Sequence, residues 1–134
     1  MAREILFRGE RRDNGKWAEG HLIVFPKSKI TKIMVWNAAD LDFDAIEVRP
    51  ESVGQFTGLT DKNGKRIWEG DIARYTNKDG TPAFYEVVWD NELFAPMFQL
   101  IGSCSGFFVA GMNELVEIIG NIHDNPELLN GTES

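Results

Sequence analysis

The chain has 134 residues, 43% of them apolar, so it is long enough for one compact domain or two small lobes sharing a core, and too apolar to be disordered. Its formal net charge of −7 opposes contact with phosphate backbones and disfavours nucleic acid as a partner. The single cysteine, Cys104, excludes a disulfide within the chain, no apolar run reaches the ~20 residues that span a bilayer, and the first residues do not resemble a signal peptide. Together these features predict a cytoplasmic protein with no membrane contact.

Alternation of apolar and polar residues predicts short strands along most of the chain. In the first of them, Ile5 and Phe7 face one way and their polar neighbours face the other. The expected strands, in chain order, are residues 4–8, 17–25, 29–36, 83–89, 97–101 and 115–122. Short strands at this close spacing predict an antiparallel barrel or sandwich.

Turn sequences separate several of these strands. Asn14-Gly15 and Asn63-Gly64 are pairs that accept positive φ angles, so we expect each to close a hairpin of type I′. Residues 77–80, Asn-Lys-Asp-Gly, predict a third and longer turn.

Helical signals are few, and residues 43–47 and 113–114 are expected to form single turns at most. Near the end of the chain, Asn125 suits an N-cap and Pro126 suits the first helical position. We therefore expect a short terminal helical turn whose leucines pack back on the fold, followed by a flexible tail over residues 130–134.

Three segments carry a resemblance to a known family. Residues 53–72 read VGQFTGLTDKNGKRIWEGDI, residues 3–8 read REILFR with Lys16-Trp17 and Gly20 behind them, and residues 117–129 read EIIGNIHDNPELL. In this order they resemble the YopX family, small proteins encoded by phages and prophages of mostly low-GC Gram-positive bacteria. Family members often have tyrosine at the positions of Phe56 and Trp68, where this chain keeps an aromatic ring.

The resemblance implies a mostly β fold with an SH3-like barrel, and it implies no established activity. We therefore expect one domain over residues 1–129, with a smaller N-terminal β lobe over 1–50 and a barrel lobe over 51–129. The stretch 26–43 departs from the family pattern and is expected to be a variable insertion or a sheet edge.

The residues of the central signature are expected to serve the backbone rather than chemistry. Glycine permits unusual φ angles, Asn-Gly forms the turn, and a carboxylate in the Glu-Gly-Asp corner can accept main-chain N–H bonds. These signature residues are Gly54, Phe56, Gly58, Asn63, Gly64, Trp68, Glu69, Gly70 and Asp71. The alternative is that Glu69 and Asp71, two apart in a strand and so on one face, form an acid/base or metal pair. Two carboxylates are fewer oxygen ligands than a hard metal ion usually takes.

No catalytic, cofactor-binding or metal-ligating constellation is visible elsewhere. The two histidines, His21 and His123, are too few for a zinc site, and Cys104 stands in a Gly-Ser-Cys-Ser-Gly segment without a neighbouring base. Nucleophile-elbow, Walker A and dinucleotide motifs do not occur. We therefore expect no enzymatic activity and no cofactor.

Each of the four tryptophans is expected either to pack in the core or to contribute to a binding surface, because large aromatic rings dominate both. They are Trp17, Trp36, Trp68 and Trp89. The leading hypothesis is a non-enzymatic binding or adaptor module that acts on a protein partner or associates with itself as a homo-oligomer. The alternatives are an accessory to phage DNA replication or recombination that contacts single strands, and a small metal-dependent hydrolase. Two basic clusters, expected as solvated strand edges, are Arg8, Arg11 and Arg12, and Lys27, Lys29 and Lys32.

Overall fold

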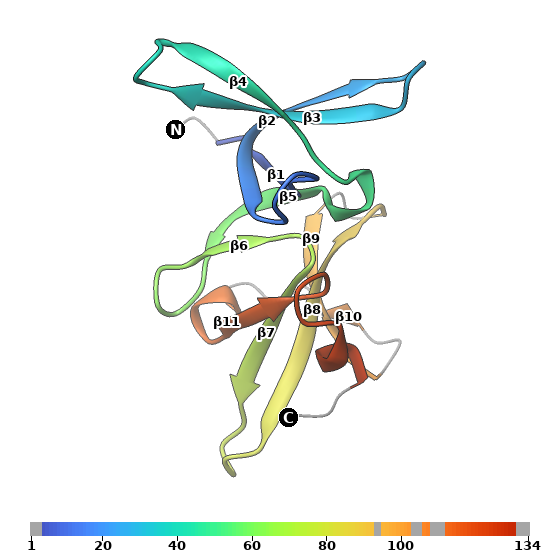
Figure 1. The fold of residues 1–134 in the computed structure, drawn as a ribbon. Helices are drawn as coiled ribbons and strands as arrows, with labels where there is room; N and C mark the ends of the chain where they lie inside the picture. Colours follow the sequence, from blue (N-terminus) through green and yellow to red (C-terminus); the bar gives the residue numbers. More distant parts are fainter. Residues whose placement is uncertain (1–3, 93–94, 103–105, 108–111, 131–134) are drawn as a thin grey trace. The chain divides into compact units, whose positions relative to one another are not determined.

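The computed structural model describes residues 4–92, 95–102, 106–107 and 112–130. These residues form eleven strands and three short 3₁₀ helices (Figure 1). The strands are β1 Phe7–Glu10, β2 Trp17–Phe25, β3 Ile30–Asn37, β4 Asp42–Glu47, β5 Gly54–Thr60, β6 Arg66–Trp68, β7 Asp71–Thr76, β8 Pro82–Asp90, β9 Ala95–Leu100, β10 Gly106–Phe107 and β11 Glu117–Asn121. The 3₁₀ helices are η1 Pro50–Ser52, η2 Met112–Glu114 and η3 Pro126–Asn130.

The chain divides into two compact units, Met1–Phe56 and Thr57–Ser134. One sheet has the order β4-β3-β2-β1-β5-β6, in which β5 continues across the unit boundary, and the other has the order β10-β9-β8-β7-β11. The pairings registered in both sheets are antiparallel. The expected mostly β class is therefore confirmed. The expected SH3-like barrel is not, because the described strands form two open sheets.

In the first unit, strand β2 changes partner along its length. Its first half pairs with β1 and its second half with β3, and Gly20 lies at the change, where an added Cβ would stand 2.1 Å from the carbonyl oxygen of Met34. Only glycine permits so close a backbone approach. The buried residues of the apolar core of this unit are Ala18, Ile33 and Val48. The second half of β2, with β3 and β4, thus extends beyond this core as a three-stranded sheet.

In the second unit, the sheet packs around one apolar cluster, whose buried members are Ile67, Ala73, Val87, Phe98, Met112, Val116 and Ile118. Strand β11 pairs with β7 and its register shifts between Ile118 and Gly120. An added Cβ at Gly120 would meet the side chain of Asn125 at 2.3 Å, so this glycine also makes room for a close contact.

All three predicted turns occur, but the two Asn-Gly turns are not of type I′. That type needs positive φ at both central residues. Among the described non-glycine residues, only Lys29 and Leu41 have positive φ, whereas Gly15 and Gly64 have φ of 71° and 83°. Only the glycine of each pair is therefore left-handed, as in hairpins that combine a type I turn with a bulge.

Six expected strands are observed, with shifts at their ends: residues 4–6 precede β1, and the segment expected over 29–36 is β3. The single helical turn expected over 43–47 is wrong, because these residues lie in β4. The turn expected at 113–114 is η2, and the terminal helical turn is η3, which Asn130 ends. The rest of the expected tail lies outside the described residues. Within the described part of the chain, no helix has the length and apolar character needed to cross a membrane.

Candidate binding surface

The signature residues of β5 hold the strand in place. The N–H of Phe56 donates to the carbonyl of Leu6 at 2.9 Å, and the ring is buried. Gly58 has a φ of 86°, and next to it the hydroxyl of Thr57 donates to the carbonyl of Ile67 at 2.8 Å. The polar groups described in this strand thus bond to backbone carbonyls of neighbouring segments.

The strongest polar anchor of the signature is Asp61, which is buried. Its Oδ1 accepts the N–H groups of Asn63 and Lys65, and its Oδ2 accepts the N–H of Ile118 on β11, each at 2.9 Å. Burial by itself would raise the pKa of Asp61, but these three amides and the charge of Lys65 lower the pKa below its ordinary value. Sequence reasoning missed this residue, although an aspartate two residues before an Asn-Gly pair is a known turn-capping signal.

Asp71, at the start of β7, accepts the N–H of Trp68 at 2.7 Å and is only 2% exposed. Glu69 and Gly70 form the turn before the strand, and Gly70 has a φ of 89°. The expectation that Glu69 and Asp71 share one strand face is therefore wrong, because alternation does not extend through that turn. No three His, Cys, Asp or Glu side chains among the described residues are placed to hold a metal ion.

The four tryptophans have different environments. Trp68 is buried, and Trp17 is half-buried with the guanidinium carbon of Arg8 4.7 Å from its ring centroid. Arg8 is itself buried, so its placement on a solvated edge was wrong. Trp89 is half-buried beside a hollow of about 410 Å³ on β8 and β9. Trp36 alone of the four is mostly exposed, at 53%.

Trp36 belongs to a set of apolar side chains on one side of the β2–β3–β4 sheet. The pairing register, combined with the alternation of strands, puts Met34 opposite His21 and Ala45, and Trp36 opposite Phe43, on the same side. The ring contact is consistent with this placement, because Trp36 and Phe43 pack edge to face with centroids 5.2 Å apart. We call this set the apolar face; its members are Ile23, Phe25, Ile30, Met34, Trp36, Phe43 and Ala45, with the polar residues His21, Lys32 and Glu47 on the same side.

The apolar face is strongly exposed. Ile23, Phe25, Trp36 and Phe43 are all among the large hydrophobic residues that the described structure leaves in solvent. The edge contact of His21 with Phe43, at a centroid distance of 6.2 Å, adds a polar group to the same surface. Large apolar side chains exposed together on one sheet face mark an interaction site in soluble proteins.

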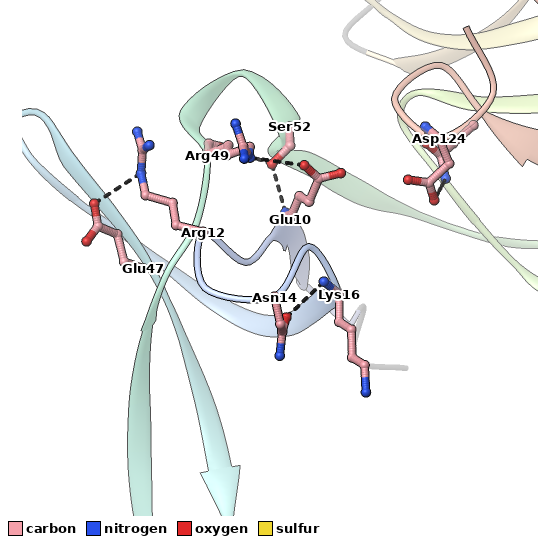
Figure 2. A network of polar contacts seen from close by, with 9 residues as sticks. Glu10, Arg12, Asn14, Lys16, Glu47, Arg49, Ser52 and Asp124 are labelled. Atoms are coloured by element: carbon pink, nitrogen blue, oxygen red, sulfur yellow. Dashed lines mark hydrogen bonds and ion pairs between the residues drawn. The ribbon is translucent and has the colours of Figure 1, made fainter. Parts of the chain in front are cut away.

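Two ion pairs lie where β4 ends, and one of them includes Glu47 of the apolar face (Figure 2). The Nε of Arg12 lies 3.1 Å from a carboxylate oxygen of Glu47, and the Nε of Arg49 lies 3.1 Å from one of Glu10. In the same network, the hydroxyl of Ser52 accepts the N–H of Glu10 at 2.8 Å. These bonds tie the end of β4 and helix η1 to β1 and to the segment that follows it.

A second candidate lies in the second unit, where a hollow of about 130 Å³ is lined by Glu86, Gln99 and Leu129. Burial raises the pKa of Glu86, and the nearby charge of His123 acts against this rise. One carboxylate beside one imidazole does not supply the ligand set of a metal site. Cys104 lies outside the described residues.

Comparison with known proteins gives a family and places the chain among solved structures of similar fold. The model of the YopX protein family matches residues 6–130. Protein EF1440 from Enterococcus faecalis has a crystal structure that aligns with a TM-score of 0.58 and 22% identity, covering 96% of this chain and 99% of that chain. At this identity the likeness shows the fold alone. The search of curated proteins found no match.

Proposed function

This chain belongs to the YopX family, and from that premise we propose that it is a non-enzymatic binding module whose apolar face binds a protein partner. The proposal places it in the cytoplasm of a bacterium that carries phage genes. The observation that carries it is the exposed edge-to-face pair of Trp36 and Phe43.

Two physical reasons support a protein partner. Tryptophan, when it is exposed within an apolar patch, is the residue most enriched in binding hot spots, and neighbouring apolar side chains exclude water around it. Keeping these rings in water costs free energy in proportion to their area, so a partner that covers them gains what the free protein forgoes. Exposed side chains spread over three strands suit another protein surface better than a small molecule, which prefers a concave pocket.

Single-stranded nucleic acid has one local observation in its favour, since Lys27, Lys29 and Lys32 lie close in the chain to Phe25. Base stacking on an aromatic ring beside cations is the usual arrangement for such ligands. The other end of the same sheet carries Asp40, Asp42 and Asp44, which would repel the phosphates of a strand that follows the face. We expect no binding of a labelled oligonucleotide by fluorescence anisotropy at micromolar protein and low salt.

Affinity capture from prophage-induced cells tests the binding function when three proteins are compared. They are the wild type, the double variant Trp36→Ser with Phe43→Ser, and the control Leu115→Ser, which removes an equally exposed apolar side chain from the second unit. We expect a protein captured by the wild type and the control to be lost from the double variant. Identical captured sets for all three proteins would contradict the proposal.

A further inference from the structure

The two Asn-Gly turns are alike in their local structure. Asn14-Gly15 lies between β1 and β2, Asn63-Gly64 lies between β5 and β6, and each pair is exposed and precedes a lysine. Both glycines are left-handed. The N–H of Gly15 donates to the main-chain carbonyl four residues earlier, and that of Gly64 to the carbonyl three residues earlier, both at 3.0 Å. The chain therefore presents the same chemical group twice in the same kind of turn.

An asparagine before a glycine is a reactive pair. The main-chain nitrogen of the glycine loses its proton to hydroxide and attacks the side-chain Cγ of the asparagine, which forms a cyclic imide. The side-chain nitrogen takes a proton from water and leaves as ammonia, which restores the hydroxide. Water then opens the imide at either carbonyl and gives aspartate or isoaspartate. Glycine favours the attack because it has no Cβ to obstruct it.

The folded turn blocks the first step, because the attacking nitrogen keeps its proton in a hydrogen bond to a carbonyl. The reaction therefore proceeds from molecules in which the turn has opened locally, and its rate follows the free energy of that opening. Both pairs are exposed, so exposure does not distinguish them. The bonds that hold each turn closed decide which asparagine reacts.

The first turn is held mainly by bonds within itself. The N–H of Lys16 donates to the Oδ1 of Asn14 at 2.9 Å (Figure 2). In the described part of the chain, the hydrogen bonds of residues 13–16 lie within residues 11–16, and they include an ion pair of an exposed aspartate, which contributes little. The tie to another strand lies before the tip, at Arg12, whose N–H donates to a β4 carbonyl at 3.2 Å. The tip can thus open while this tie stays in place.

The second turn is tied to another strand at its tip. The N–H of Asn63 donates to the buried carboxylate of Asp61, whose other oxygen accepts the N–H of Ile118 on β11. The N–H of Lys62 donates to the carbonyl of Val116, just before the same strand, at 3.1 Å. Opening this turn therefore breaks bonds to β11 as well as its own. The loss of one buried bond changes an opening equilibrium by about tenfold.

We propose that Asn14 deamidates spontaneously in the folded protein and that Asp61 protects Asn63 from the same reaction. The reaction needs neither the apolar face nor a partner, so it is independent of the proposed binding function. Each product at Asn14 carries one more negative charge, and isoaspartate also adds one carbon to the main chain of the turn. That carbon falls between Glu10 and Trp17, the last residues that β1 and β2 pair, and so loosens the hairpin of the first unit.

Incubation of the intact protein in mildly alkaline buffer, followed by peptide mass spectrometry, tests the proposal. Digestion after glutamate yields residues 11–19, 52–69 and 128–133, which separates the two turns from a third pair, Asn130-Gly131, whose glycine lies outside the described residues. We expect peptide 11–19 of the folded protein to deamidate at least about tenfold faster than peptide 52–69. In guanidinium chloride, where neither turn is closed, the two peptides should deamidate at similar rates.

The variant Asp61→Ala gives a second test, with circular dichroism to check that it is folded. It should deamidate about tenfold faster at Asn63 and at an unchanged rate at Asn14. An unchanged rate at Asn63 in the folded variant would overturn the protective role of Asp61.

Two results for the wild type would overturn the proposal without any variant. They are equal rates at Asn14 and Asn63 in the folded protein, and a difference between them that persists in guanidinium chloride. A melting temperature that falls on incubation as much in Asn14→Gln as in the wild type would refute the loosening of the hairpin, because glutamine forms the corresponding imide far more slowly.

Discussion

Replacing Asp61 by alanine should destabilise the second unit far more than an ordinary turn substitution. The carboxylate accepts three amide bonds, one of them from the buried N–H of Ile118. Leaving that buried donor unpaired costs about 1–3 kcal/mol, and each of the two hairpin amides, which can turn to water, loses about 0.5–1.5 kcal/mol. The three losses together are expected to reduce the free energy of unfolding by about 4 kcal/mol.

Urea unfolding followed by far-ultraviolet circular dichroism measures this difference, with Asp79→Ala as the matched control. Asp79 caps another hairpin that has a left-handed glycine, accepting the N–H and the hydroxyl of Thr81, but it is exposed. The control should therefore unfold close to the wild type. If Asp61→Ala changed the midpoint no more than Asp79→Ala does, burial of the Ile118 amide would not be the source of the stability.

The remaining predictions concern acidity and backbone geometry. Because the folded-state pKa of Asp61 is lowered, its bonds stabilise the fold fully above about pH 4 and are lost as the pH falls through the lowered value. The melting temperature should therefore fall below about pH 4. It should fall less steeply with pH in the variant Asp61→Asn. Gly20→Ala should cost at least about 3 kcal/mol in urea unfolding, because its Cβ would overlap a main-chain oxygen, whereas Gly64→Ala, with open space but positive φ, should cost about 1–2 kcal/mol. Leu41→Asn should raise the melting temperature, gaining about 0.5–1 kcal/mol, since Leu41 is exposed and has a φ of 52°.

Strand positions followed from the sequence because period-2 patterning is a local signal. This holds for six of the eleven strands, since β5, β6, β7 and β10 were not among the expected strands and β4 was expected to be a helical turn. The alternation of Asp42, Phe43, Asp44 and Ala45 in β4 is strand-like, but its polar composition resembles a helical turn when the neighbouring β3 is not considered. Turn type was also misjudged, since Asn-Gly serves both a type I′ turn and a type I turn with a bulge, and the difference lies in a single φ angle.

The candidate surface depended on tertiary information. Trp36 and Trp68 are alike as residues, yet one is exposed on a three-stranded sheet and the other is buried in the second unit. Whether each ring is exposed or buried depends on which strands pair and in which register, and no local sequence pattern predicts either. Likewise, Ile23, Phe25 and Phe43 form one surface only once β2, β3 and β4 are aligned.

Acids and bases are divided unevenly between the two units: residues 1–56 hold nine Lys and Arg against nine Asp and Glu, whereas residues 57–134 hold five against twelve. This division governs how the protein behaves near its isoelectric point of about 4.8. At this pH the total charge is zero, but neither unit is neutral. Partial protonation of carboxylates leaves the first unit, which is balanced at pH 7, with a positive charge, while the acid-rich second unit remains negative. Each molecule is then a zwitterion with unlike lobes, and neighbouring molecules attract through them instead of merely ceasing to repel. Mildly acidic buffers should accordingly favour precipitation, and added salt should redissolve the protein by screening those attractions.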